Sequence, residues 1–183
     1  MTALLFPGRH HLLTNFQLEY LTLATQGDPR ELLDVDGRPV ELAEPFDAVI
    51  WAVTSANHAN TRRNPLPAHR REAAIEELAD QLDVPSFVFM IDDVGSTGRF
   101  AEYVLKKIEV DSRRRFCLTP ENCVVACSTP AVIEQYERLG FRILPVELVD
   151  RGAVTMSHST PWQLLEHLVS VGLAGRDWRA DPE

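Results

Sequence analysis

Two short segments of the sequence contain residue types that could bind the phosphate, ribose or base of a nucleotide. The first, at residues 7–17, reads PGRHHLLTNFQ. Gly8 lets the backbone approach a ligand, Arg9 supplies a positive charge beside two histidines, and the start of a helix is predicted to follow. Helix N-termini favour anions because their first N–H groups lack intrahelical partners and the helix dipole is positive there. The segment therefore suits a phosphate group. The alternative is a plain turn whose histidines are solvated.

The second segment, at residues 53–65, reads VTSANHANTRRNP. It is dense in hydroxyl and amide side chains and adds two adjacent cations, Arg62 and Arg63. Such side chains could hydrogen-bond a base or a ribose, but an ordinary polar loop has the same composition. Neither segment is specific when it is taken alone.

The elements that must position these segments follow from apolar patterning. Nearly continuous apolar runs occur at residues 2–7, 46–53, 86–91, 123–127 and 141–146. Runs of this kind are typical of parallel strands that are covered on both faces. Helix-period segments lie between and after them, at residues 12–23, 68–82, 99–108, 130–139 and 161–171. The alternation predicts an α/β fold, a doubly wound, Rossmann-like and mostly parallel five-stranded sheet with helices on both faces.

In such a sheet, ligands bind beyond the carboxyl ends of the strands, where both polar segments fall. The same rule selects residues 92–100, 128–130 and 154–163. An Asp36-Gly37 turn predicts a small β-hairpin insertion at residues 33–41, and Gly140 is expected to end a helix. We expect one domain over residues 1–174 and a polar tail at 175–183.

Charge and cysteine content exclude several classes of function. The chain has 183 residues, with 18 Lys and Arg against 27 Asp and Glu, for a formal charge of −9. This balance argues against nucleic acid and anionic membranes as partners. The 3 cysteines form no CxxC pair, which favours a reducing, cytoplasmic location. No signal peptide and no membrane span of about 20 apolar residues is expected, and the histidine pair lacks further ligands for a metal.

Residues 46–72 resemble the second strand and the following loop of nicotinamide-nucleotide adenylyltransferases, especially the archaeal type, which belong to the HIGH-type nucleotidyltransferase superfamily. Those proteins read G-S-A-Q, then T-x-E-N-P-F-T and an E-R pair. Here the matching positions are Ser55, Ala56, Asn57, Thr61, Asn64, Pro65 and Arg71. Residues 91–94 resemble the family's I-x-D-I, and residues 128–130 with 138–141 resemble its G-N-P and R-G-Y. The resemblance runs over most of residues 8–165, and the hairpin insertion is extra to it.

The sequence departs from this family at its catalytic signatures. The pattern G-R-F-Q-P-x-H-N-G-H aligns with residues 8–17, where the two signature histidines are replaced by Thr14 and Gln17. The late S-x-T-x-x-R signature aligns with residues 158–163, where Gln163 stands in place of the arginine. Because these replacements carry no positive charge, stabilisation of the transferring phosphoryl group is weakened. Candidates that could substitute are His10, His11, Arg62, Arg63 and Arg151.

The resemblance implies site residues in three groups. The catalytic group comprises His10, His11, Thr14 and Gln17. Nucleotide and phosphate binding is expected at Gly8, Arg9, Asn15, Ser128, Thr129, Ser159, Thr160 and Gln163. Acceptor binding is expected at Ser55, Ala56, Asn57, Thr61, Asn64 and Phe100. Phe100 aligns with a tryptophan that stacks on the nicotinamide ring in the family. The alternative is that Phe100 is the first core residue of its helix.

The function implied by the resemblance is transfer of AMP from ATP to a phosphorylated acceptor such as nicotinamide mononucleotide (NMN), with release of pyrophosphate. Mg²⁺ would enter with ATP rather than occupy a protein site. Partners would be small-molecule nucleotides, and a homo-oligomer remains compatible with the sequence. The alternative is a catalytically impaired nucleotide- or dinucleotide-binding or regulatory module of the same fold.

Overall fold

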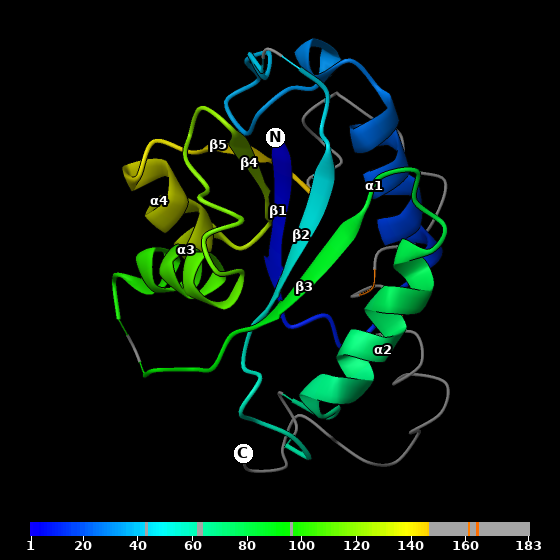
Figure 1. Ribbon diagram of the computed structural model, residues 1–183, viewed down its shortest axis with the longest axis vertical. Coiled ribbons are helices and arrows are strands. Elements are labelled where there is room, and N and C mark those ends of the chain that lie inside the picture. The colour runs from blue at the N-terminus through cyan, green and yellow to red at the C-terminus, as the bar shows by residue number, and fades with distance from the viewer. Residues whose placement is uncertain (43, 62–63, 96, 147–160, 162–163, 165–183) are drawn as a thin grey trace.

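Five strands form one parallel sheet in the computed structural model, which describes residues 1–42, 44–61, 64–95, 97–146, 161 and 164. The strands are β1 (Ala3–Gly8), β2 (Ala48–Val53), β3 (Ser86–Met90), β4 (Cys123–Ala126) and β5 (Arg142–Leu144). Their order is β3-β2-β1-β4-β5, and every neighbouring pair is parallel (Figure 1). This arrangement confirms the predicted α/β class and the doubly wound topology.

The central strand is β1, where Ala3 pairs with Ala48 of β2 on one side and with Cys123 of β4 on the other. Every residue of β2 and β4 is buried, which explains why these strands read as continuous apolar runs. The outer strand β3 is only partly buried along its length.

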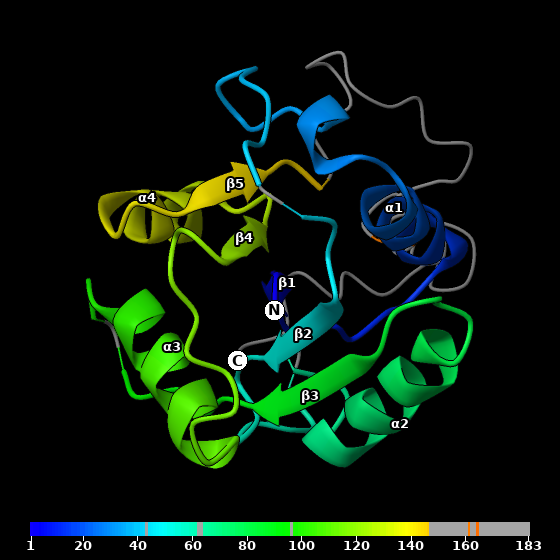
Figure 2. The same ribbon diagram turned by 45° about the horizontal axis from the view of Figure 1, so that its top comes forward.

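Helices cover both faces of the sheet. The first face carries α1 (Asn15–Gln26) and α2 (Ala68–Ala79), and the second carries α3 (Phe100–Asp111) and α4 (Pro130–Arg138) (Figure 2). Successive side chains of β1 alternate between the two cores, so that Leu4 packs under α1 and α2 while Leu5 packs under α3 and α4. A 3₁₀ turn, Pro29–Glu31, follows α1.

The predicted hairpin insertion is present and covers one edge of the sheet. Leu33 and Pro39 form an isolated antiparallel bridge around a turn at Gly37, whose φ is +75°. The N–H of Val35 donates to the carbonyl of Ile143 in β5 at 2.9 Å. This bond occupies part of an edge strand that would otherwise be open.

The end of α4 agrees with its sequence signal, whereas α1 begins at Asn15 instead of residue 12 and α3 continues to Asp111 instead of residue 108. Gly140 follows α4 with φ +85°, and its N–H donates to the carbonyl of Glu137 at 2.8 Å, as expected for a terminating glycine. The last predicted helix, apart from residues 161 and 164, and the polar tail lie outside the described residues, so the domain limit at residue 174 stays a prediction. Within the described part of the chain, no helix is both long and apolar enough to cross a bilayer.

Candidate nucleotide site

The loops that follow β1, β2 and β3 meet at the carboxyl edge of the sheet, because parallel strands end on the same side. We call residues 8–14 the first loop and residues 54–67 the second loop. Backbone hydrogen bonds join these loops. The N–H of Thr54 in the second loop donates to the carbonyl of Gly8 in the first loop at 2.9 Å, and the N–H of Ala56 donates to the carbonyl of Ile91, just after β3, at 3.0 Å. The predicted ligand segments are therefore brought together.

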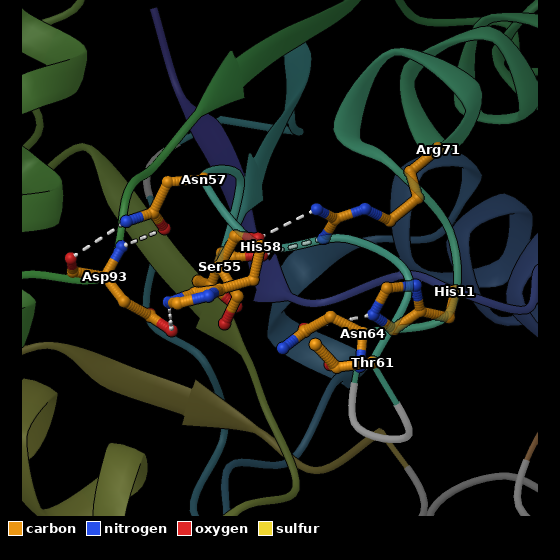
Figure 3. Close-up of polar contacts among 9 residues, drawn as sticks. His11, Ser55, Asn57, His58, Thr61, Asn64, Arg71 and Asp93 are labelled. Carbon is orange, nitrogen blue, oxygen red and sulfur yellow. Dashed lines mark hydrogen bonds and ion pairs between the residues drawn. The ribbon is translucent and has the colours of Figure 1, made fainter. Parts of the chain in front are cut away.

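Arg71 of α2 fastens the first and second loops to each other. Its side chain is fully buried (0% exposed), and one terminal nitrogen, Nη1, donates to the carbonyls of Arg9 at 2.9 Å and Thr54 at 2.8 Å. The other, Nη2, donates to the carbonyl of Ser55 at 2.9 Å (Figure 3). Burial, followed by the nearby Arg9 charge, lowers the pKa of Arg71. One buried guanidinium thus supports both loops through three backbone carbonyls.

Sequence reasoning matched Arg71 to the family but gave it no role in the site. A signal was available in the helix pattern. Arg71, Ile75 and Leu78 are spaced by four and three residues and are the buried residues of α2, whereas Ala74 is exposed. An arginine on the buried stripe of an amphipathic helix requires internal hydrogen-bond acceptors, and here the loop carbonyls supply them.

His10 is packed into the molecule rather than solvated. Its ring lies edge-on to Phe6 and Trp51, with centroid distances of 4.9 Å and 5.1 Å, and its Nε2 pairs with the carbonyl of Phe6 at 3.1 Å. Burial lowers the pKa of His10 to about 4. The imidazole is therefore neutral near pH 7 and gives no positive charge to a phosphate. Its catalytic role stays a prediction.

The conformation of His10 explains why a glycine stands at position 8. A Cβ on Gly8 would lie 2.9 Å from Cε1 and 3.0 Å from Nε2 of the His10 ring. The His10 ring therefore occupies the space beside Gly8, and the ligand contact predicted for this glycine stays a prediction.

Replacing Gly8 by alanine is expected to lower the melting temperature, because the added methyl group would push against a ring that packs on Phe6 and Trp51. The expected cost is about 1–3 kcal/mol of overpacking, measured by thermal unfolding. Gly98→Ala is the matched control, because a Cβ there meets nothing within 4 Å. Equal melting temperatures for the two variants would contradict the contact.

His11 links the first loop to the second. Its Nε2 pairs with Oδ1 of Asn64 at 3.2 Å (Figure 3). Its Nδ1 is buried and has no hydrogen-bond partner among the described residues. Burial lowers the pKa of His11, and the charges of Arg71 and Arg9 lower it further against the opposing effect of the Asn64 bond.

Thr14 and Gln17, which align with the signature histidines of the resembled family, form a capping box at the start of α1. Oε1 of Gln17 accepts from the N–H of Thr14 at 2.7 Å and from the Thr14 hydroxyl at 2.6 Å. Oγ1 of Thr14 accepts in turn from the N–H of Phe16. The Gln17 amide also donates to the carbonyl of Leu12 at 3.2 Å. Both side chains thus stabilise the helix start. Nothing in the structure tests their predicted catalytic role.

The second loop is also tied to the loop after β3. The Asn57 side chain donates to the carbonyl of Asp93 at 3.3 Å and accepts from its N–H at 2.9 Å. His58 lies beside the Asp93 carboxylate (Figure 3), and the distance from its Nε2 to Oδ2 of Asp93 is 3.7 Å. Ser55 is buried with φ +53°, a left-handed conformation that turns the chain at the end of β2. The acceptor-site candidates Ser55 and Asn57 therefore lie close together, and the Asn57 side chain connects the second loop to the loop after β3.

The remaining predicted residues are spread around the same edge. Asn15 and Thr129 are exposed at the starts of α1 and α4, and Ser128 is partly exposed beside Thr129, whose hydroxyl makes no capping bond. Phe100 is the first residue of α3 and packs partly buried against the second core, 6.0 Å from Tyr103. This position agrees with the core alternative and leaves part of the ring open.

Several predicted residues lie outside the described part of the chain: Ser159, Thr160, Gln163, Arg62, Arg63 and Arg151. Among the described residues, no group of three or more His, Cys, Asp or Glu side chains is placed to hold a metal ion.

The chain is similar to a nicotinamide-nucleotide adenylyltransferase of Halorubrum lacusprofundi. The two are 23% identical over 140 residues, which span 76% of this chain and 68% of that protein. No protein-family model matches the chain. The similarity supports a nucleotidyltransferase-like relationship at a coarse level.

Proposed function

We propose that this protein binds ATP at the first loop and transfers AMP to a phosphorylated acceptor such as NMN at the second. An acceptor phosphate oxygen forms a bond to the α-phosphorus of ATP, the bond to the β-phosphate oxygen breaks, and pyrophosphate leaves. The observation that carries the proposal is the Arg71 clamp, which holds the backbones of both loops at the carboxyl edge of the sheet. The distant similarity to an adenylyltransferase agrees with it.

The chemistry of the first loop suits phosphate oxygens rather than a metal. Arg9 is exposed, and the start of α1 follows a few residues later. The buried, positively charged guanidinium of Arg71 donates to the carbonyl of Arg9. These groups donate hydrogen bonds and carry positive charge, whereas a Mg²⁺ site calls for carboxylate oxygens. We therefore propose that Mg²⁺ enters bound to the phosphates of ATP and neutralises charge on the leaving pyrophosphate.

The runner-up is a binding or regulatory module that holds a nucleotide without turnover. The capping box favours it, because Thr14 and Gln17 use their side chains on α1 and leave only uncharged groups where the resembled family has histidines. The neutral state of His10 favours it as well.

The test is calorimetric titration with ATP and then NMN, combined with an assay of pyrophosphate release. Arg9→Ala is expected to weaken ATP binding about tenfold or more, because it removes a cation from the phosphate end. Arg70→Ala, on the exposed side of α2, is the control. Unchanged ATP affinity in Arg9→Ala would remove the first loop from the proposed site.

Phe100→Leu distinguishes a stacking role from a core role. The change keeps apolar bulk, so thermal stability is expected to change little. If Phe100 stacks on the acceptor ring, NMN affinity falls several-fold while ATP affinity stays constant. A large loss of stability with unaltered NMN affinity would return Phe100 to the core.

A further inference from the structure

The two loops of the proposed site are joined side chain to side chain as well as through Arg71. His11 comes from the loop after β1, and Asn64 comes from the loop after β2, 53 residues further along the chain. The first loop is the proposed nucleotide side and the second is the proposed acceptor side. This bond joins the two loops at one point.

The Asn64 end of this bond is held in place by its own loop. Asn64 is 8% exposed, its N–H donates to Oγ1 of Thr61 at 3.0 Å, and its carbonyl accepts from the N–H of Thr61 at 3.2 Å. These two bonds fix the Asn64 backbone to Thr61, and the side chain that accepts from His11 starts from this fixed point. A displacement of Asn64 is therefore expected to move Thr61 with it.

At the His11 end, the buried Nδ1 and the nearby cations favour the neutral imidazole. Since Oδ1 of Asn64 is an acceptor, Nε2 carries the proton and Nδ1 holds a lone pair, which is buried and unpartnered. Protonation would create a buried N–H at Nδ1 with no acceptor. The groups that face it are Arg9 and neutral His10 on its own loop and Arg71 from α2, so a positive charge here meets two further cations.

We propose that His11 is a positioning residue, which sets the acceptor loop against the nucleotide loop through its bond to Asn64 and does so only as the neutral imidazole. The proposal rests on the proposed adenylyl transfer. A displacement of about 1 Å between reacting groups can lower a rate by about 100-fold. Loss of the bond therefore lowers turnover more than it lowers nucleotide affinity.

The experiment compares His11→Leu, which removes the donor, with His11→Gln, which keeps an N–H donor but does not titrate. His69→Leu, an exposed histidine of α2, is the matched control. Pyrophosphate release with ATP and NMN gives kcat, and titration gives the Kd for ATP. His11→Leu is expected to lower kcat about 10- to 100-fold with the ATP Kd within about twofold of wild type. His11→Gln should restore most of kcat, and Asn64→Leu should add little when combined with His11→Leu.

The pH profile provides a readout that a purely structural role would not move. Because the pKa of His11 is lowered from its ordinary value of 6.5 in the folded protein, wild-type kcat should hold through pH 6.5 and fall at a more acidic pH, and His11→Gln should lack this fall. Two outcomes would overturn the positioning role and leave the proposed function standing. One is a kcat of His11→Leu equal to that of wild type, and the other is a kcat of His11→Gln as low as that of His11→Leu when both variants have the same thermal stability. A wild-type protein that does not bind ATP would overturn the proposed function, and ATP binding without pyrophosphate release would overturn both transfer and positioning for transfer.

Discussion

Replacing Arg71 by alanine is expected to lower the free energy of unfolding by about 3 kcal/mol, which corresponds to a fall in melting temperature of roughly 6–12 °C. The variant leaves the carbonyls of Arg9, Thr54 and Ser55 without the donors that now satisfy them. It also opens a cavity where a fully buried side chain lay. The gain from no longer burying a charge offsets part of this cost. Denaturant and thermal unfolding measure the difference.

The neighbouring residue provides the control. Arg70 is exposed on the same helix, so Arg70→Ala should change stability by no more than about 0.5 kcal/mol. Equal stability of the two variants would show that Arg71 does not carry the loops.

The second large effect is a pH dependence of stability that comes from His10. In the unfolded chain this imidazole protonates near its ordinary pKa of 6.5, whereas burial in the folded protein lowers its pKa to about 4. Between these values the unfolded state binds more protons, so stability is full above pH 6.5 and falls as the pH drops toward 4. The total expected loss from this group is roughly 3 kcal/mol.

The variant that isolates this effect is His10→Asn, because asparagine does not titrate and tolerates the φ of +50° at this position. The His10→Asn variant should have a lower free energy of unfolding than wild type at neutral pH. Its free energy of unfolding should, however, fall by less than that of wild type between pH 6.5 and pH 4. Carboxylates titrate alike in both proteins, so the difference between the two curves reports His10. Parallel curves would show that His10 is not buried as a neutral group.

The sheet could be predicted because its cause is local. Each strand is a short apolar run, and in β2 and β4 burial on both faces leaves no polar alternation that would resemble a surface strand. The predicted start of α1 was three residues too early, because the helix begins at Asn15 and not at residue 12. The sequence T-x-x-Q at Thr14 and Gln17 is a capping box, but the family alignment assigned the same two residues to catalysis.

The contacts within the candidate site could not be predicted, because each joins residues far apart in the chain. His10 reads as a turn residue, and its burial depends on Trp51 of the neighbouring strand. The bond between Asn57 and Asp93 spans 36 residues and exists only once β2 and β3 are paired. The spacing of Arg71 with Ile75 and Leu78 indicates its burial, but the carbonyls to which it donates lie 16 to 62 residues away and come together only in the folded sheet.

Incubation of the wild-type protein with ATP, Mg²⁺ and NMN, followed by ³¹P NMR of the products, tests the proposed adenylyl transfer most directly. The proposal predicts that a dinucleotide, with its phosphorus–oxygen–phosphorus bridge, and pyrophosphate appear in equal amounts. Recovery of intact ATP and NMN from a protein that binds both would contradict it and would leave the binding module as the function of this fold.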